Sequence, residues 1–97
     1  MLTGVSGHFS ATHRGEDGRL HGHTWHVTAW FKNNYRSDVR CYQAMLATML
    51  GRLDHTELPD DLSWGEDIAR QIAALANAVE VEVNRPAERI HARWRWA

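Results

Sequence analysis

Residues 20–31, LHGHTWHVTAWF, alternate between two kinds of position over their whole length. One parity carries His21, His23, Trp25, Val27, Ala29 and Phe31, and the other carries Gly22, Thr24, His26, Thr28 and Trp30. A period of two places successive side chains on opposite faces of a β-strand. The alternation therefore predicts a strand over 20–31 with one face against an apolar core.

Three further strands are predicted from the same kind of pattern. Residues 5–13 alternate loosely, with one face formed by Phe9, Ala11 and His13. The charged, Gly-rich RGEDG at 14–18 predicts a turn from this strand into the next. Near the C-terminus, two strands joined by a turn at RPAE are predicted from the alternation of Val79, Val81 and Val83 and then of Ile90, Ala92, Trp94 and Trp96.

Between the two pairs of strands, apolar residues recur at helical spacing. The first helix is predicted to begin at Ser37 or Asp38, either of which can cap it. Its inward stripe is formed by Val39, Tyr42, Leu46, Met49, Leu50 and Leu53. SWGE at 63–66 has the form of a capping box, with Ser63 as the cap and Glu66 reaching back. In the helix that follows, the residues predicted to point inward are Ile68, Ile72 and Leu75.

The order β-β-α-α-β-β in a chain of 97 residues predicts one α+β domain, residues 1–97. We expect a four-stranded antiparallel sheet with two helices on one face. The opposite face then needs cover, and the five tryptophans of the chain fit contacts between subunits. A homo-oligomer is therefore expected.

The charge balance argues against two classes of partner. With a net charge of −1 and a pI near 6.6, the chain favours neither nucleic acid nor an anionic membrane. No segment approaches the ~20 apolar residues of a membrane span, and the N-terminus lacks the apolar run of a signal peptide. The single cysteine, Cys41, cannot form an intrachain disulfide, and we interpret it as a packing residue rather than a nucleophile. These features predict a cytoplasmic protein.

Three histidines can converge on one ion. Residues i and i+2 of a strand lie on the same side, roughly 6–7 Å apart at Cα, so His21 and His23 can act together while His26 faces the other way. If residues 14–20 form the hairpin connection, His13 lies opposite this pair. Three imidazoles with a fourth position open are the ligands of a catalytic rather than a structural zinc. On the pattern alone, half-buried polar histidines without a metal remain an equal alternative.

A second candidate is LDH at 53–55. Asp54 can orient the His55 imidazole and stabilise its protonated form, as a general base requires. Alternatively, His55 lies near a helix C-terminus simply because the helix dipole favours positive charge there. The pattern by itself favours this second interpretation.

Taken in order, FSATH, GRLHGHTW, SDVRCY, RLDHTEL, SWGEDIA and AVEVEV resemble the 6-pyruvoyl-tetrahydropterin synthase / 6-carboxytetrahydropterin synthase family. The corresponding family patterns include F-x-A-x-H, L-H-G-H, L-D-H-x-x-L-N, P-T-x-E and V-x-V-x-E-T, and the resemblance spans nearly the whole chain. It implies a T-fold, or tunnelling fold. Trimers of this fold close their sheets into a barrel, two trimers often stack into a hexamer, and active sites lie between subunits.

The resemblance also implies a chemistry. His13, His21 and His23 match the zinc ligands of the family, and Asp54 and His55 match its catalytic pair. The implied substrate is 7,8-dihydroneopterin triphosphate. A base removes a carbon-bound proton while Zn²⁺ stabilises the developing oxygen anion, and triphosphate loss or side-chain cleavage follows. The carboxy-forming branch of the family feeds queuosine biosynthesis, and the pyruvoyl-forming branch feeds tetrahydrobiopterin.

Two departures keep another interpretation open. The family cysteine falls on Asp17, preceded by Glu16, and a carboxylate could take up a proton there if burial raised its pKa. The glutamate that anchors the pterin ring falls on Val83, which cannot accept its hydrogen bonds. Glu66 matches the P-T-x-E glutamate, for which capping is a sufficient role. The alternative is a divergent paralogue with another substrate, or a non-catalytic metal-binding oligomer.

Overall fold

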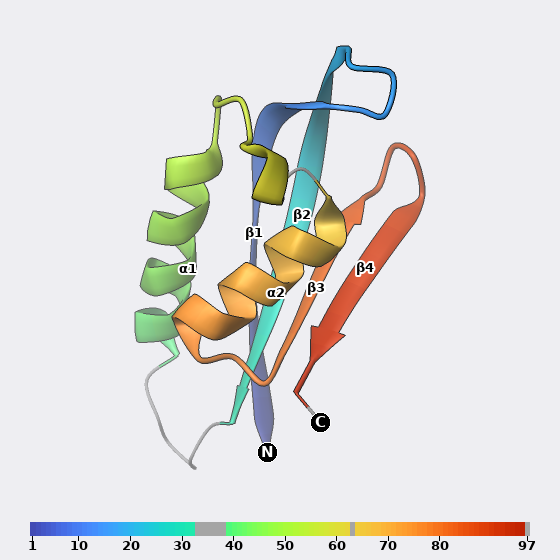
Figure 1. Cartoon of the computed structure of the whole chain (residues 1–97). Helices are drawn as coiled ribbons and strands as arrows, with labels where there is room; N and C mark the ends of the chain where they lie inside the picture. Colours follow the sequence, from blue (N-terminus) through green and yellow to red (C-terminus); the bar gives the residue numbers. More distant parts are fainter. Residues whose placement is uncertain (33–38, 63, 97) are drawn as a thin grey trace.

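The computed structural model describes residues 1–32, 39–62 and 64–96. Its elements in chain order are β1 (Leu2–Arg14), β2 (Leu20–Lys32), α1 (Arg40–Leu53), the short 3-10 helix η1 (Asp60–Leu62), α2 (Gly65–Ala76), β3 (Glu80–Arg85) and β4 (Ile90–Arg95). The strands form one antiparallel sheet in the order β1-β2-β3-β4, and α1 and α2 cover the same face of it (Figure 1). The predicted α+β architecture is confirmed.

The two hairpins of the sheet differ in length. β1 pairs with β2 along all 13 residues of each strand, from Leu2 opposite Lys32 to Arg14 opposite Leu20. β3 pairs with β2 only between His26 and Trp30 of β2. The first half of β2 therefore extends past the end of β3, and the turn between β3 and β4 lies beside this extension.

The face of the sheet under the helices is apolar, as the alternation predicts. Phe9 of β1 stacks on Trp25 of β2 with ring centroids 5.2 Å apart, and both rings are buried. The same layer is continued by Val5, Ala11, Val27, Ala29, Phe31, Val81 and Val83. Because Phe9 is enclosed on all sides, truncating it to Ala would lower the free energy of unfolding by about 3–5 kcal/mol.

Helix α1 presents the predicted stripe to the sheet. Leu46 and Leu50 are buried, and the side chains that pack partly against the core include Tyr42, Met45, Met49 and Leu53. Cys41 is exposed, so the prediction that it packs is wrong: it lies beside the stripe, on the solvent side of the helix. The two predicted caps, Ser37 and Asp38, lie outside the described residues.

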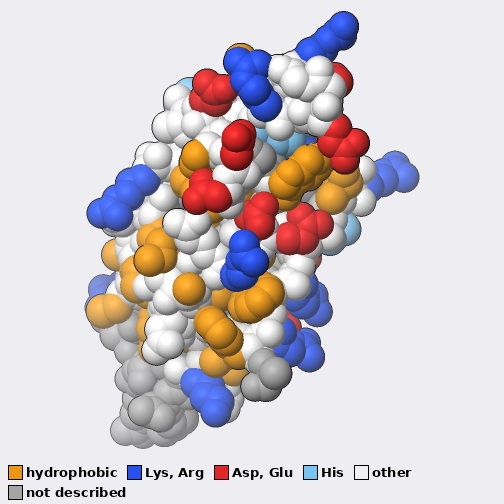
Figure 2. Space-filling view, viewed as in Figure 1, with side chains coloured by type: hydrophobic (Ala, Val, Ile, Leu, Met, Phe, Trp, Pro, Cys, Tyr) orange, Lys and Arg blue, Asp and Glu red, His pale blue; other side chains and the backbone are white. Residues whose placement is uncertain are grey.

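Helix α2 departs from the prediction in its inward face. Ile68 and Ile72 are buried, but Leu75 is 68% exposed, so its inward assignment is wrong. The helix instead buries three small side chains as it packs on β3 and β4, namely Ala69, Ala73 and Ala76. Leu75 lines a shallow groove of about 200 Å³ between the helices, where Figure 2 shows hydrophobic side chains interspersed with charged ones.

Only part of the predicted capping box at the start of α2 lies within the described residues. The N-cap residue is Trp64, which has extended backbone angles and makes no side-chain capping hydrogen bond. Ser63, the predicted cap, lies outside the described residues. Glu66 lies in the first turn of the helix, where the positive end of the helix dipole favours a carboxylate.

The face of the sheet away from the helices is polar. Ion pairs join the two short strands there: Arg93 donates to Glu82 at 2.8 Å and Arg95 donates to Glu80 at 2.6 Å. Cover of this face by a second subunit stays a prediction. None of the helices in the described part of the chain is long and apolar enough to cross a membrane.

Candidate functional site

Three histidines meet at the end of the β1–β2 hairpin. His13 lies directly opposite His21, and His23 lies opposite Ala11, so all three side chains share the helix side of the sheet. The turn between the strands is compact because Gly18 adopts φ +76°, a left-handed conformation that glycine accepts without a steric penalty. The predicted placement of His13 opposite the H-G-H pair is confirmed in the backbone register, while the binding of one ion by all three stays a prediction.

The spacing of the three imidazoles fits a common ion approximately. The ring centroids are 4.9 Å apart for His13 and His23, 6.0 Å for His13 and His21, and 6.3 Å for His21 and His23. Three imidazoles bound tetrahedrally to one zinc through Zn–N bonds of about 2.0–2.1 Å would have centroids roughly 5 Å apart. The rings are therefore gathered but slightly too open. Consistent with this, the described residues contain no group of three or more His, Cys, Asp or Glu arranged so that it could hold a metal ion as it stands.

Two tryptophans enclose the cluster. Trp25 meets His13 and His23 edge-on, at centroid distances of 5.8 and 5.4 Å. Trp64, just before α2, meets His13 edge-on at 5.8 Å. His13 is only 3% exposed as a result. These rings restrict the imidazoles on the core side and leave the approach from solvent to His21 and His23.

Each outer histidine contacts a carboxylate. His23 Nδ1 lies 2.7 Å from Glu88 Oε1, and His21 Nε2 lies 3.0 Å from Asp17 Oδ1. The contact with His23 lowers the pKa of Glu88 below its usual value. The backbone N–H of Arg19 donates to Asp17, and this bond together with His21 lowers the pKa of Asp17. The pKa of Asp17 is therefore not raised by burial, which was the condition for it to replace a thiolate base.

Glu88 was missed in the sequence because it is 65 residues from its partner. It lies in the turn between β3 and β4, and it reaches His23 because β2 extends past the end of β3. A carboxylate on the second nitrogen of a metal-binding histidine is a common arrangement, since it fixes the tautomer and the ring orientation. Once the strand order is known, that turn is the place to look for such a residue.

The Asp54–His55 pair forms where the chain leaves α1. Asp54 accepts a hydrogen bond from the backbone N–H of Ser10 at 2.8 Å through Oδ1, and its Oδ2 lies 2.7 Å from His55 Nδ1. The Ser10 N–H, followed by His55, lowers the pKa of Asp54. The His55 side chain is 84% exposed, so the pair is oriented by Asp54 but open to solvent.

The backbone around this pair is fixed to the edge of the sheet. His55 has φ +58°, which is uncommon for a residue with a side chain, and its N–H donates to the carbonyl of Ser10 at 2.6 Å. Two residues further on, Thr12 donates to the carbonyl of Thr56 and accepts from the N–H of Leu58. The segment from 54 to 58 thus runs along the outer edge of β1 and holds His55 in its left-handed conformation.

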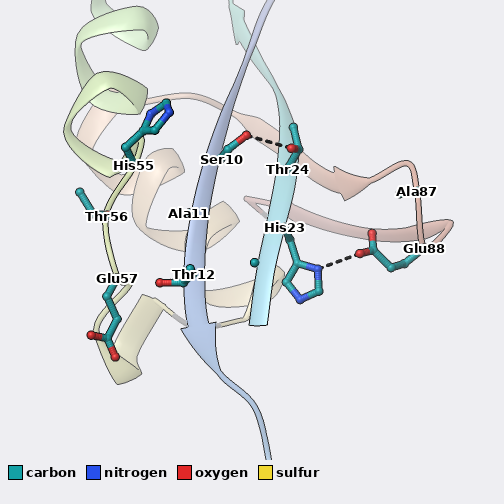
Figure 3. Close-up of a pocket in the computed structure, with 11 residues that line it drawn as sticks. Ser10, Ala11, Thr12, His23, Thr24, His55, Thr56, Glu57, Ala87 and Glu88 are labelled. Carbon is teal, nitrogen blue, oxygen red and sulfur yellow. Dashed lines mark hydrogen bonds and ion pairs between the residues drawn. The ribbon is translucent and has the colours of Figure 1, made fainter. Parts of the chain in front are cut away.

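One residue of each group, His23 and His55, lines an open groove of about 680 Å³, which extends from His23 and Glu88 to His55 (Figure 3). They do not touch: β1 separates His55 on its outer edge from His23 on β2. Between them lie hydroxyl groups, including Ser10 and Thr24, whose oxygens are 2.8 Å apart. The structure thus brings the three histidines together and leaves the Asp-His pair apart from them within one subunit.

A four-stranded antiparallel sheet, two helices on one face and a histidine cluster on the first hairpin define a domain of the T-fold class. The model of the 6-pyruvoyl tetrahydropterin synthase family matches residues 5–94, and the chain therefore belongs to this family. Membership supports a tetrahydropterin synthase-like function at the level of the family. A comparison with curated proteins finds no matching relative.

Proposed function

We propose that the chain is a zinc-dependent lyase of the 6-pyruvoyl- or 6-carboxytetrahydropterin synthase type, acting on 7,8-dihydroneopterin triphosphate or a close relative. His13, His21 and His23 would hold the metal. The observation that carries the proposal is the gathering of these imidazoles within 4.9–6.3 Å in a chain of this family. A bound zinc would supply positive charge that stabilises an oxygen anion developing on the substrate.

Proton transfer is assigned to the Asp54–His55 pair. If His55 Nδ1–H donates to Asp54, Nε2 keeps its lone pair and can remove a proton from the substrate. Asp54 stays ionised because its pKa is lowered, so it can stabilise the imidazolium that forms. The exposure of His55 leaves room for a substrate to reach it.

Asp17 has a weaker claim to a proton-transfer role. Its lowered pKa makes the carboxylate a poor base near neutral pH, and its contact with His21 gives it a positioning role instead. We retain it as a candidate catalytic residue because it occupies the position of the family cysteine. A proton-transfer role predicts that Asp17→Ala abolishes turnover and leaves the bound metal in place, whereas a positioning role on His21 predicts a fall in zinc affinity of about 10–100-fold with turnover retained at saturating zinc.

A homo-oligomer, either a trimer or a hexamer, would complete the site. Within one chain β1 separates His55 from the histidine cluster, whereas a neighbouring subunit could place its own Asp-His pair against the cluster. In the described sheet β4 is an edge strand whose outer side pairs with no other strand, and such an edge is available for pairing between chains. Native mass measured by light scattering tests this part of the proposal. The exposed Cys41 thiol is compatible with the reducing cytoplasm.

One observation favours a second candidate, a paralogue with a substrate other than a pterin. Val83, in the position of the pterin-anchoring glutamate, is 1% exposed and lines a pocket of about 190 Å³ beside the histidines. Trp25 and Trp64 line the same pocket, and Glu66 is the acidic group among its described lining residues. A pterin could be anchored there only if Glu66 served in place of the missing carboxylate.

The test joins metal content to turnover. Purified full-length protein should carry about one tightly bound zinc per chain and consume 7,8-dihydroneopterin triphosphate, with release of triphosphate or a shortened side chain. Zinc without turnover of any dihydropterin would support the second candidate. Protein that binds no metal, and that folds equally well after His21→Ala and His23→Ala, would overturn the zinc proposal.

A further inference from the structure

Two histidines outside the groove face each other on the open side of the sheet. His8 of β1 pairs in register with His26 of β2, and both positions have the parity opposite to the histidine cluster. Their rings stack with centroids 5.6 Å apart and an angle of 28° between planes. Both side chains are exposed in the single chain, on the face that the helices leave uncovered.

The surroundings of the pair leave its ring nitrogens available. Among the described residues, neither the His8 ring nor the His26 ring has a hydrogen bond or an ion pair. The next residues in the same row across the sheet are Asn84 and His91, and His91 already contacts Glu82, with Nδ1 at 3.5 Å from Oε1. His8 interacts electrostatically with Asp54, so a carboxylate charge lies near one end of the pair.

This arrangement has the dimensions of a two-histidine chelate. Imidazole is a preferred ligand of Cu²⁺, Ni²⁺ and Zn²⁺, and two imidazoles on one such ion have centroids roughly 5 Å apart. The observed 5.6 Å is within the range that rotation of two exposed side chains can close. The extended backbone of the paired strands keeps the two residues opposite each other, so the second nitrogen binds at a high effective concentration.

We propose that His8 and His26 form a separate site for a divalent transition-metal ion. Of these ions, Cu²⁺ should bind most tightly, as the Irving–Williams order predicts. The remaining coordination positions stay open to water. This site does not depend on the proposed lyase function, because it shares no residue with the histidine cluster and lies on the other face of the sheet.

Copper titration of the full-length chain tests the proposal. The titration is made in a Cys41→Ser background, because the exposed thiol would otherwise reduce Cu²⁺, and with His21→Ala and His23→Ala added so that the first cluster is lost. After circular dichroism confirms the fold, this chain should bind about one Cu²⁺ whose paramagnetic resonance spectrum shows coupling to two imidazole nitrogens. Adding His26→Ala or His8→Ala should weaken binding by at least about tenfold and leave one coupled nitrogen.

His91→Ala is the matched control, since it removes an exposed histidine from the same row and should leave the isotherm unchanged. If the chain does not fold once His21 and His23 are both replaced, the titration is made on the zinc-loaded chain, with and without His26→Ala. Identical isotherms and spectra with and without His26 would overturn the proposal. So would a spectrum that shows a single coupled nitrogen before His26 is removed.

Discussion

The histidine cluster and the Asp54–His55 pair each contribute one residue, His23 and His55, to the same groove, but they are held in different ways. The cluster is fixed by hairpin register, by the edges of Trp25 and Trp64, and by carboxylates on its outer rings. The pair is fixed through backbone contacts with the edge of β1 and the Ser10 N–H on Asp54, and its imidazole is open to solvent. Under the proposed function, metal binding would therefore be a property of one folded chain, whereas proton transfer would need a substrate or a second subunit.

The largest effect expected is from His23→Ala. Loss of a residue that contacts only a zinc ligand weakens zinc binding by about 10–100-fold. Removing one of the three proposed ligands themselves should weaken it by more than this, and turnover should disappear with the metal. Zinc per chain by mass spectrometry and a turnover assay measure both. His91→Ala is the control, and full zinc content in the His23 variant would contradict the assignment.

Asp54→Asn should separate the two regions most cleanly. The amide still contacts His55 but cannot stabilise its protonated form, so turnover should fall by about 10²–10⁴-fold. Zinc content should not change, because Asp54 touches none of the three proposed ligands. A parallel loss of zinc in this variant would show that the pair and the cluster are one structural unit.

Glu88→Gln should weaken the cluster without dismantling it. The neutral amide can still orient His23 but no longer places a negative charge against the ring, so zinc affinity should fall by about 10–100-fold. Turnover at saturating zinc should be close to that of the unmodified chain. Glu57→Gln is a matched control, since Glu57 lines the same groove and contacts Arg14 rather than a histidine. Equal zinc affinity in both variants would remove Glu88 from the site.

The smallest effect is a pH dependence confined to the pair. The pKa of Asp54 in the folded chain lies below its ordinary value of 3.8, so the unfolded chain takes up this proton first as the pH falls. The contribution of Asp54 to stability is therefore complete above that value and is lost as the pH drops through the lower folded pKa. Over this pH range the Ser10 amide should lose protection, which means that its hydrogen exchange speeds up relative to the intrinsic exchange rate at the same pH. In Asp54→Asn this pH-dependent loss of protection should disappear. Unaltered protection at low pH would show that the carboxylate does not hold this edge.

Most of the fold could be predicted from alternation alone. β1 and β2 bury one parity and expose the other, so a strand assignment fixes which residues face the core. α2 could not be predicted as well, because alanine carries a weak hydrophobic signal. Its sheet-facing side is built from Ala69, Ala73 and Ala76. With these alanines against the sheet, Leu75 lies towards solvent.

The part of the site that lies on one hairpin could be predicted from the sequence. The convergence of His13 with His21 and His23 follows from strand parity and a short turn, both of which are local. Glu88 and Trp64 come from distant turns, and their approach depends on strand order and on the unequal lengths of the two hairpins. No local pattern encodes those distances.

The central claim is that His13, His21 and His23 bind one zinc and leave a coordination position free. X-ray absorption at the zinc edge, on protein loaded with one equivalent, tests it most directly. The account predicts three imidazole nitrogens at about 2.0–2.1 Å and one oxygen ligand that exchanges with added substrate. A zinc with fewer imidazole ligands, or one with four protein ligands and no exchangeable oxygen, would contradict it.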